Sequence, residues 1–393
     1  MDSNVWLTAA AWMALALAAS LFSIRLGVSV ALIEILIGVA AGNFLGVHTT
    51  PWIDFLATFG SGLLTFLAGA EIDPDSLRRH FRPAMAIGVV SFLAPFVAAA
   101  AFAHWVGGWD RQAAWIAGVS LSTTSVAVVY AVMLETGLNR TELGKLILAA
   151  CFITDLGTVL ALGILFANFN AWMLLFVAVT AAVLWQLPRL TRMVITRVGH
   201  RVSEPEVKFI FLVLFLLGGL AKLAQSEAVL PAYLVGLVIA GVFVRDRVLM
   251  ERMRAIAFTM LTPFYFLKAG LYVSLPAVAT GALLIGALLL VKMGSKIVSI
   301  WPITRAFRFE QREGIYTTLL MSTGLTFGTI SALFGLTNHI IDQAQYTVLV
   351  TVVIGSAVIP TLIAQRFFEP PPAHAITEPS PPAPAIAAPV GGA

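Results

Sequence analysis

This sequence has little charge and almost no cysteine. Of its 393 residues, 11% are charged and 59% are hydrophobic, and the mean hydropathy is +0.93. Soluble domains carry about 25% charged residues, so the composition excludes a soluble globular protein and predicts a polytopic membrane protein. The single cysteine, Cys151, excludes an internal disulfide framework and a zinc cluster built on cysteine.

The motifs of common soluble enzymes are also absent. The sequence has no GxxxxGK phosphate loop, no GxGxxG after a strand, no HExxH and no GxSxG. Its histidines lie apart, mostly near predicted loops, without metal or triad spacing: His48, His80, His104, His200, His339 and His374. We therefore expect no enzyme activity and no cofactor.

Long apolar runs make up most of the chain. We identify thirteen spans of about 17–25 residues, the length that a helix needs to cross a hydrocarbon core of roughly 30 Å. They lie near 5–23, 27–46, 52–70, 83–106, 113–134, 144–167, 170–187, 207–225, 228–244, 255–273, 276–301, 313–336 and 344–367. The predicted fold is all-α, with about thirteen transmembrane helices.

The positions of Lys and Arg predict the orientation. With the N-terminus outside, nineteen of the 24 Lys and Arg residues fall in cytoplasmic loops, and the outer loops hold only Arg111. Positive charge gathers in cytoplasmic loops of membrane proteins, so we expect the C-terminus in the cytoplasm. The same distribution argues for a lipid bilayer and against nucleic acid as the partner, despite a pI of about 9.4. The Pro- and Ala-rich stretch 369–393 predicts a disordered cytoplasmic tail.

One carboxylate lies deep inside a predicted span. The span 144–167 places Asp155 near its middle, within the run AACFITDLGTVL. An ionisable group at that depth is costly and indicates a function. The alternative is a structural carboxylate that is hydrogen-bonded to a neighbouring helix.

Two other spans contain runs of hydroxyl and glycine residues. Residues 120–127 read SLSTTSVA and residues 322–329 read STGLTFGT. Ser and Thr side chains compete with the backbone for hydrogen bonds and favour a local break in the helix. Breaks at corresponding places in the two halves of a transporter mark its ion site. The alternative is close helix packing through small residues. The residues expected to line the breaks are Ser122, Thr124, Ser125, Thr323, Gly324 and Thr326.

Several other charged residues fall inside the predicted spans. Glu34, Lys222 and Lys268 need partners or water at that depth, and the two lysines can extend toward an interface. Asp54 lies close enough to a helix start to act as a first-turn anion. The sequence leaves the roles of Glu34, Lys222 and Lys268 open.

Several segments, in order, resemble one transporter family. Residues 63–73 (LLTFLAGAEID) are similar to its LLLFLAGLELD signature, and residues 263–271 (PFYFLKAGL) to its PxFFxxxGL run. Further similarities lie at residues 38–46, 122–127, 203–206, 230–237 and 292–299. The chain thus resembles the monovalent cation:proton antiporter-2 family, which includes Kef-type and bacterial sodium/proton antiporters.

The resemblance implies inverted repeats with two crossed, broken helices. On this chain the transmembrane domain would cover residues 1–368, and the crossed helices would be 113–134 and 313–336. A core domain would hold about 83–167 and part of 255–367, and the remainder would be a scaffold that forms a homodimer.

The resemblance also implies the site. Asp155 would bind a monovalent cation and a proton in turn, with Thr154, Thr124 and Ser125 completing the site. Electrogenic members of the family carry two adjacent acids where this chain has Thr154 and Asp155. With one carboxylate, one proton can be exchanged for one cation, so we expect electroneutral exchange.

A lysine near the site is implied as well. The segment KMGSKIVS points to Lys296, with Lys292 one turn earlier. Since Thr154 replaces the acid that this lysine pairs with in two-acid members, its partner is either a helix C-terminal dipole or Asp155.

The expected function is alternating-access exchange of Na⁺, or Li⁺, for protons in a bacterial inner membrane, with a role in pH homeostasis. Potassium/proton exchange stays open, because oxygen ligands alone do not separate the two ions. A sodium-coupled symporter of organic solutes with the same architecture is a further alternative. A membrane scaffold or receptor without transport would leave Asp155 and the paired breaks unexplained.

Overall fold

The computed structural model describes residues 4–26, 29–70, 72, 78–136, 138, 141–166, 171–199, 201–224 and 228–370. Within these ranges the secondary structure is helical and contains no strand. Eight helical segments are long and apolar enough to cross a membrane, and two further apolar helices are shorter. The predicted all-helical membrane fold is confirmed, while the number of transmembrane helices stays a prediction.

The helices follow the predicted spans closely. In chain order they are α1 (Val5–Leu26), α2 (Val30–Phe44), α3 (Pro51–Ala70), α5 (Phe81–Trp105), α6 (Arg111–Ser122), α7 (Val126–Thr136), α8 (Glu142–Leu165), α9 (Ala171–Val198), α10 (Pro205–Leu223), α11 (Val229–Arg245), α12 (Arg247–Ile256), η2 (Ala257–Leu261), α13 (Thr262–Leu271), α14 (Leu275–Thr280), α15 (Ala282–Ala306), α16 (Gln311–Met321), α17 (Thr326–Thr337), α18 (Gln343–Ile363) and η3 (Ala364–Phe368).

Three predicted spans differ from the observed helices. The span 276–301 is divided at Gly281 into α14 and α15, and α15 continues to Ala306. Helix α9 runs through Pro188 to Val198, whereas the predicted span ended at residue 187. Proline removes one backbone donor from the helix but is tolerated inside membrane helices. The Arg192 side chain donates to the Pro188 carbonyl at 3.0 Å. The predicted span 255–273 is composed of α12, the π-helical turn η2 and α13, with Pro263 at the start of α13.

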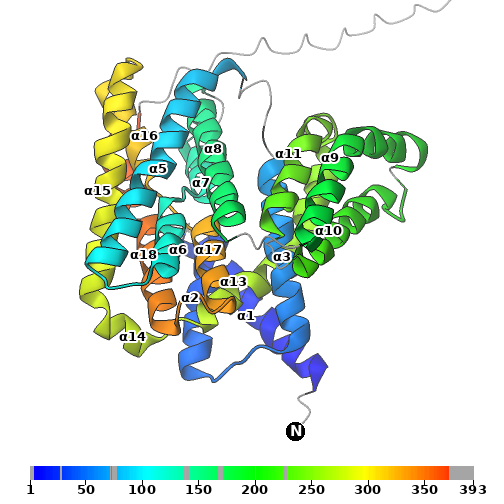
Figure 1. Cartoon of the computed structure of the whole chain (residues 1–393), viewed down its shortest axis with the longest axis horizontal. Coiled ribbons are helices and arrows are strands. Elements are labelled where there is room, and N and C mark those ends of the chain that lie inside the picture. The colour runs from blue at the N-terminus through cyan, green and yellow to red at the C-terminus, as the bar shows by residue number, and fades with distance from the viewer. Residues whose placement is uncertain are drawn as a thin grey trace, which may run out of the picture.

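The helices form two groups, which Figure 1 shows side by side. The crossing group consists of α5 to α8 and α14 to α18, and the flanking group of α1 to α3 and α9 to α13. One hydrophobic cluster lies within the flanking group, between α3 and α9 to α12. Another lies within the crossing group, and the largest cluster joins the two groups.

Glycines bring pairs of helices in the flanking group into backbone contact. A Cβ added at Gly236 of α11 would lie 2.0 Å from the Phe66 carbonyl oxygen of α3, and one at Gly69 would lie 2.3 Å from the Tyr233 carbonyl oxygen. Gly38 and Gly270 make the equivalent approach between α2 and α13. In a bilayer the hydrophobic effect does not drive helices together, and small residues at such crossings allow the close packing that holds them instead.

The charged residues left open by the sequence have distinct surroundings. Lys268 of α13 is buried and forms an ion pair with Asp54, in the first turn of α3, at 2.7 Å. Lys268 thus has a partner on another helix, and Lys222, in the last turn of α10, is exposed. Extension of either lysine toward an interface stays a prediction. Glu34 of α2 is 2% exposed, and its Oε2 has no hydrogen-bond partner among the described residues.

The last helical turn, η3, ends at Phe368. Nearly all of the predicted tail, residues 371–393, lies outside the described residues.

The glycine contact between α3 and α11 gives a test of this packing. We expect Gly236→Ala to destabilise the protein by about 1–3 kcal/mol, because the added methyl group meets backbone atoms that cannot rotate away. Gly241→Ala, on the same helix with nothing within 4 Å, is the matched control. Thermal melting in detergent, followed by size-exclusion chromatography, measures both, and equal melting temperatures would contradict the close approach.

Candidate functional site

Two helices are interrupted inside the crossing group, as the hydroxyl and glycine runs predict. Helix α6 ends at Ser122 and α7 begins at Val126; residues 123–125 lie outside both helices, and Thr123 has extended backbone. Helix α16 ends at Met321 and α17 begins at Thr326. Both predicted breaks are confirmed.

Hydroxyl side chains satisfy the carbonyls that the breaks leave open. Ser122 donates to the Val119 carbonyl at 2.9 Å and Thr123 to the Ser120 carbonyl at 3.0 Å. In the second helix, Thr323 donates to the Leu320 carbonyl at 2.8 Å. The last carbonyls of a helix have no partner within the helix, so these residues make a buried helix end possible in both places.

The two breaks are bonded to each other. The Ser125 amide donates to the Thr323 carbonyl at 3.2 Å, and the Thr124 hydroxyl donates to the Met321 carbonyl at 2.8 Å. Residues about two hundred positions apart in the chain are thereby fixed side by side, in the arrangement of two crossed, broken helices.

The Lys296 ammonium of α15 lies at this crossing and is fully buried. It donates to the Met321 carbonyl at 2.6 Å, the Thr123 carbonyl at 3.0 Å and the Thr124 hydroxyl at 2.9 Å. A fourth acceptor, the Ser91 hydroxyl of α5, lies at 3.2 Å. Its charge thus faces the C-terminal ends of α6 and α16, which carry partial negative charge.

Lys292, one turn earlier on α15, is in a different situation. It is also fully buried, but its Nζ has no hydrogen-bond partner in the described part of the chain. A Cβ at Gly324 would lie 2.2 Å from this Nζ. Gly324 therefore makes room for the Lys292 ammonium at the second break.

Asp155 lies near the middle of α8, a helix that contacts α5 in the crossing group and α11 in the flanking group. It is 1% exposed, and its Oδ1 has no hydrogen-bond partner among the described residues. The ion pairs of these residues include none between Asp155 and Lys296, although Lys296 is close enough to act on it electrostatically. A buried carboxylate without a partner is costly, so this group is suited to bind a proton or a cation.

The other predicted site residues are placed as follows. The Thr154 hydroxyl donates to the Ala150 carbonyl at 3.1 Å and to the Gly88 carbonyl of α5 at 3.3 Å. Thr154 thus joins α8 to α5. Ser125 caps α7 by accepting from the Val128 amide at 3.4 Å, and Thr326 is partly exposed at the start of α17. Their roles as ion ligands stay predictions.

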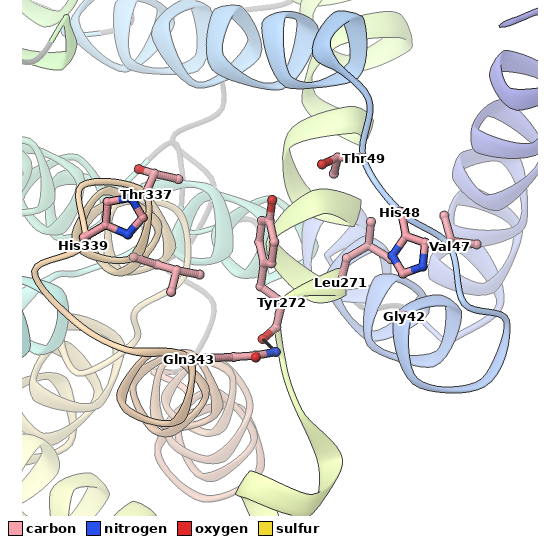
Figure 2. A pocket seen from close by; sticks show the side chains of 10 residues that line it. Gly42, Val47, His48, Thr49, Leu271, Tyr272, Thr337, His339 and Gln343 are labelled. Atoms are coloured by element: carbon pink, nitrogen blue, oxygen red, sulfur yellow. Dashed lines mark hydrogen bonds between the residues drawn. The ribbon is translucent and has the colours of Figure 1, made fainter. Parts of the chain in front are cut away.

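A cavity of about 660 Å³ opens between the two groups at the far end of α17. Figure 2 shows His48 and Thr49 from the α2–α3 loop on one side and Thr337 and His339 on the other. Tyr272 lies between them. About 15 Å of α17 separates this cavity from the break, at 1.5 Å per residue, and the predicted orientation places the opening on the outer side.

Two residues near the crossing have no obvious signal in the sequence. Ser91 is one hydroxyl in an apolar helix, and Tyr233 of α11 is one aromatic residue among many. The structure brings Ser91 to the Lys296 ammonium and Tyr233 to α8, where its hydroxyl donates to the Phe152 carbonyl at 3.0 Å. Only a map of contacts between distant segments would have identified them.

Comparison with known proteins agrees with this geometry. Residues 12–369 match the family model described as "Sodium/hydrogen exchanger, transmembrane". The chain is 23% identical over 359 residues to a probable Na⁺/H⁺ antiporter 3 of Methanocaldococcus jannaschii, covering 88% of this chain and 91% of that protein. It is 26% identical over 365 residues to a Na⁺/H⁺ antiporter of Enterococcus hirae, covering 87% and 92%.

A solved structure shares the fold. The sodium/proton antiporter MjNhaP1 of Methanocaldococcus jannaschii superimposes with a TM-score of 0.70 and 13% sequence identity, over 93% of this chain and 100% of that chain. At this identity the likeness concerns the fold alone.

The two lysines of α15 give a matched pair for testing the crossing. We expect Lys296→Met to destabilise the protein by about 3 kcal/mol, because it removes charged hydrogen bonds and leaves helix-end carbonyls unpaired. Lys292→Met removes an ammonium without such bonds and should cost far less or stabilise. Melting temperatures in detergent compare them, and an equal loss in both variants would contradict the assignment.

Proposed function

Because the chain belongs to the transmembrane sodium/hydrogen exchanger family, we propose that it exchanges Na⁺ for protons and that Asp155 is the group both ions occupy. The observation that carries the proposal is the buried Asp155, whose Oδ1 has no hydrogen-bond partner among the described residues, near the crossing of two broken helices. Extended backbone, helix ends and hydroxyls at such a crossing supply the oxygen ligands that a small cation needs.

The exchange follows from competition for one carboxylate. An empty, ionised Asp155 is unfavourable in a medium of low dielectric. Either a proton or a sodium ion neutralises it, so the crossing group moves past the flanking group more easily when the site is occupied. Each passage then carries one of the two ions, and alternating exposure of the site to the two sides couples their fluxes.

The geometry around Lys296 supports a site with a single charge. Its ammonium is held by the ends of α6 and α16 and by the Ser91 and Thr124 hydroxyls. The Asp155 carboxylate is therefore available to the transported ion. Thr154, where two-acid antiporters have a carboxylate, adds no second proton site. We therefore propose electroneutral exchange of one Na⁺, or Li⁺, for one proton.

The protein is a multi-pass membrane protein. We propose that it lies in a bacterial plasma membrane with its N-terminus outside. Assembly as a homodimer stays a prediction from the family resemblance.

The first test replaces the carboxylate. We expect Asp155→Asn to abolish exchange, since the amide cannot carry a proton away or neutralise a cation, while the protein remains folded. Glu34→Gln is the control, because Glu34 is also buried without a partner for its Oε2 but lies on α2, outside the crossing. Proton efflux from acid-loaded proteoliposomes, followed with a pH-sensitive dye, measures both.

The choice of cation distinguishes the alternatives in the same assay. Sodium and lithium are added in turn with valinomycin and equal potassium on both sides, which clamps the voltage, and potassium is added in a separate arm without valinomycin. Proton efflux that occurs with potassium but not with sodium or lithium would indicate a potassium/proton antiporter. Exchange at the wild-type rate in Asp155→Asn would reject the assignment of Asp155, and cation binding without proton release would favour a symporter.

The second test adds a carboxylate beside the first. We expect Thr154→Asp to make exchange respond to membrane voltage, because a second acid lets more than one proton move per cation. Thr154→Asn has nearly the same shape without the charge and should stay insensitive. Rates at voltages set by potassium gradients and valinomycin provide the measurement, and an active but voltage-insensitive Thr154→Asp would count against the single-carboxylate argument.

A further inference from the structure

Two buried tyrosine hydroxyls cross the boundary between the crossing and flanking groups. Tyr233 of α11 donates to the Phe152 carbonyl of α8 at 3.0 Å, and Tyr346 of α18 donates to the Ala269 carbonyl of α13 at 2.7 Å. Both side chains are fully buried. The two bonds run in opposite directions, since Tyr233 belongs to the flanking group and Tyr346 to the crossing group.

Tyr233 contacts both α8, which carries Asp155, and the start of α17. Phe152, which accepts its hydrogen bond, lies on α8 just under one turn before Asp155. The Tyr233 ring packs edge-on against Phe327, the second residue of α17, with ring centroids 6.4 Å apart and an interplanar angle of 72°. A shift of α8 or α17 relative to α11 would break one or both of these contacts.

Tyr346 makes the corresponding contact beside the cavity. Its ring lies edge-on to Tyr272, with centroids 6.3 Å apart, and Tyr272 lines the cavity. Gln343, one turn before Tyr346, donates to the Tyr272 carbonyl at 3.3 Å, as Figure 2 shows. The wall of the open cavity is thus bonded to α18.

Hydrogen bonds and apolar contacts act differently at such a boundary. Apolar packing is non-directional and varies with buried area, so it allows many relative positions of two helix groups. A buried hydroxyl needs its acceptor at hydrogen-bond distance and costs free energy when it is left without one. Two buried hydroxyls with acceptors across the boundary therefore select one relative position.

We propose that Tyr233 and Tyr346 are positioning residues for exchange, whose hydroxyls hold the crossing group in the arrangement with the cavity open. The inference rests on the proposed function for its link to transport. The hydrogen bonds favour the cavity-open arrangement, and they must break when the site turns to the other side of the membrane. Removing either hydroxyl shifts the equilibrium away from the open cavity.

The test uses Tyr233→Phe and Tyr346→Phe, which keep the rings and remove one oxygen each. Tyr265→Phe is the matched control, because Tyr265 of α13 is equally buried and its hydroxyl has no hydrogen-bond partner in the described chain. A reporter cysteine replaces Thr337 in the cavity wall. The single native cysteine, Cys151, is buried and leaves the background silent.

The first readout is labelling of the reporter by a membrane-impermeant maleimide, which requires no transport. We expect the labelling rate to fall by up to roughly tenfold in Tyr233→Phe and in Tyr346→Phe, the range that one hydrogen bond gives, and to stay unchanged in Tyr265→Phe. Unchanged rates in all three variants, or an equal fall in the control, would overturn the inference. A failure of the exchange assay alone would leave this readout intact and would count against the proposed function only.

The second readout is sodium-driven exchange measured from each side in oriented vesicles. An equilibrium shifted away from the open cavity raises the KM for sodium on the cavity side and lowers it on the opposite side. A purely structural defect would lower kcat from both sides without this opposite shift in KM. That result, together with a lower melting temperature, would also overturn the inference.

Discussion

The bonds of the Lys296 ammonium are the interaction on which the crossing depends. Two helices end in the middle of an apolar bundle, and each leaves carbonyls that water cannot reach. One ammonium group serves both helix ends, since Lys296 donates hydrogen bonds to the carbonyls of Thr123 and Met321. The hydroxyls of the two breaks complete the pairing. The interruption of the backbone, which creates the candidate ion site, is therefore stabilised by a side chain from a third helix.

This arrangement also explains why two lysines one turn apart need not have the same effect on the site. Lys296 is bound by four acceptors, and Lys292 lies against the glycine of the second break. Since the helix ends neutralise the first charge, Asp155 does not need to do so. The Oδ1 of the buried Asp155 is left without a hydrogen-bond partner among the described residues, which is why we propose that a proton or a cation occupies it.

Much of this could be predicted from the sequence. Long apolar runs predicted the helices, and the segments SLSTTSVA and STGLTFGT predicted the two breaks, because local hydroxyl chemistry determines them. Contacts between distant segments could not be predicted in the same way. Nothing local to Lys268 pointed to Asp54 as its partner, and the direction of the Thr154 hydroxyl depends on where α5 packs. The π-helical turn before Pro263 was not predicted, because hydropathy carries no information about which backbone hydrogen bonds a helix forms.

The contacts between helices fall into two mechanical classes. Within the flanking group, Gly69 and Gly236 bring backbones together so closely that no side chain lies between them, and such contacts do not allow gradual sliding. Between the groups, apolar rings and tyrosine hydroxyls meet instead. Relative movement is therefore expected at the second kind of contact, with the flanking helices remaining as one body.

The proposed one-for-one exchange at Asp155 would have a thermodynamic ceiling. An exchanger that trades one proton for one sodium ion moves no net charge, so the membrane potential does no work on it. The steepest sodium gradient it can maintain then equals the proton gradient. One pH unit, about 1.4 kcal/mol, sustains a tenfold ratio of sodium and no more. A cell that is alkaline inside would expel sodium through it, and a cell that is more acidic than its medium would take up sodium. In this proposal, a threonine at position 154 in place of a second acid would make the direction of flux depend on the two chemical gradients alone.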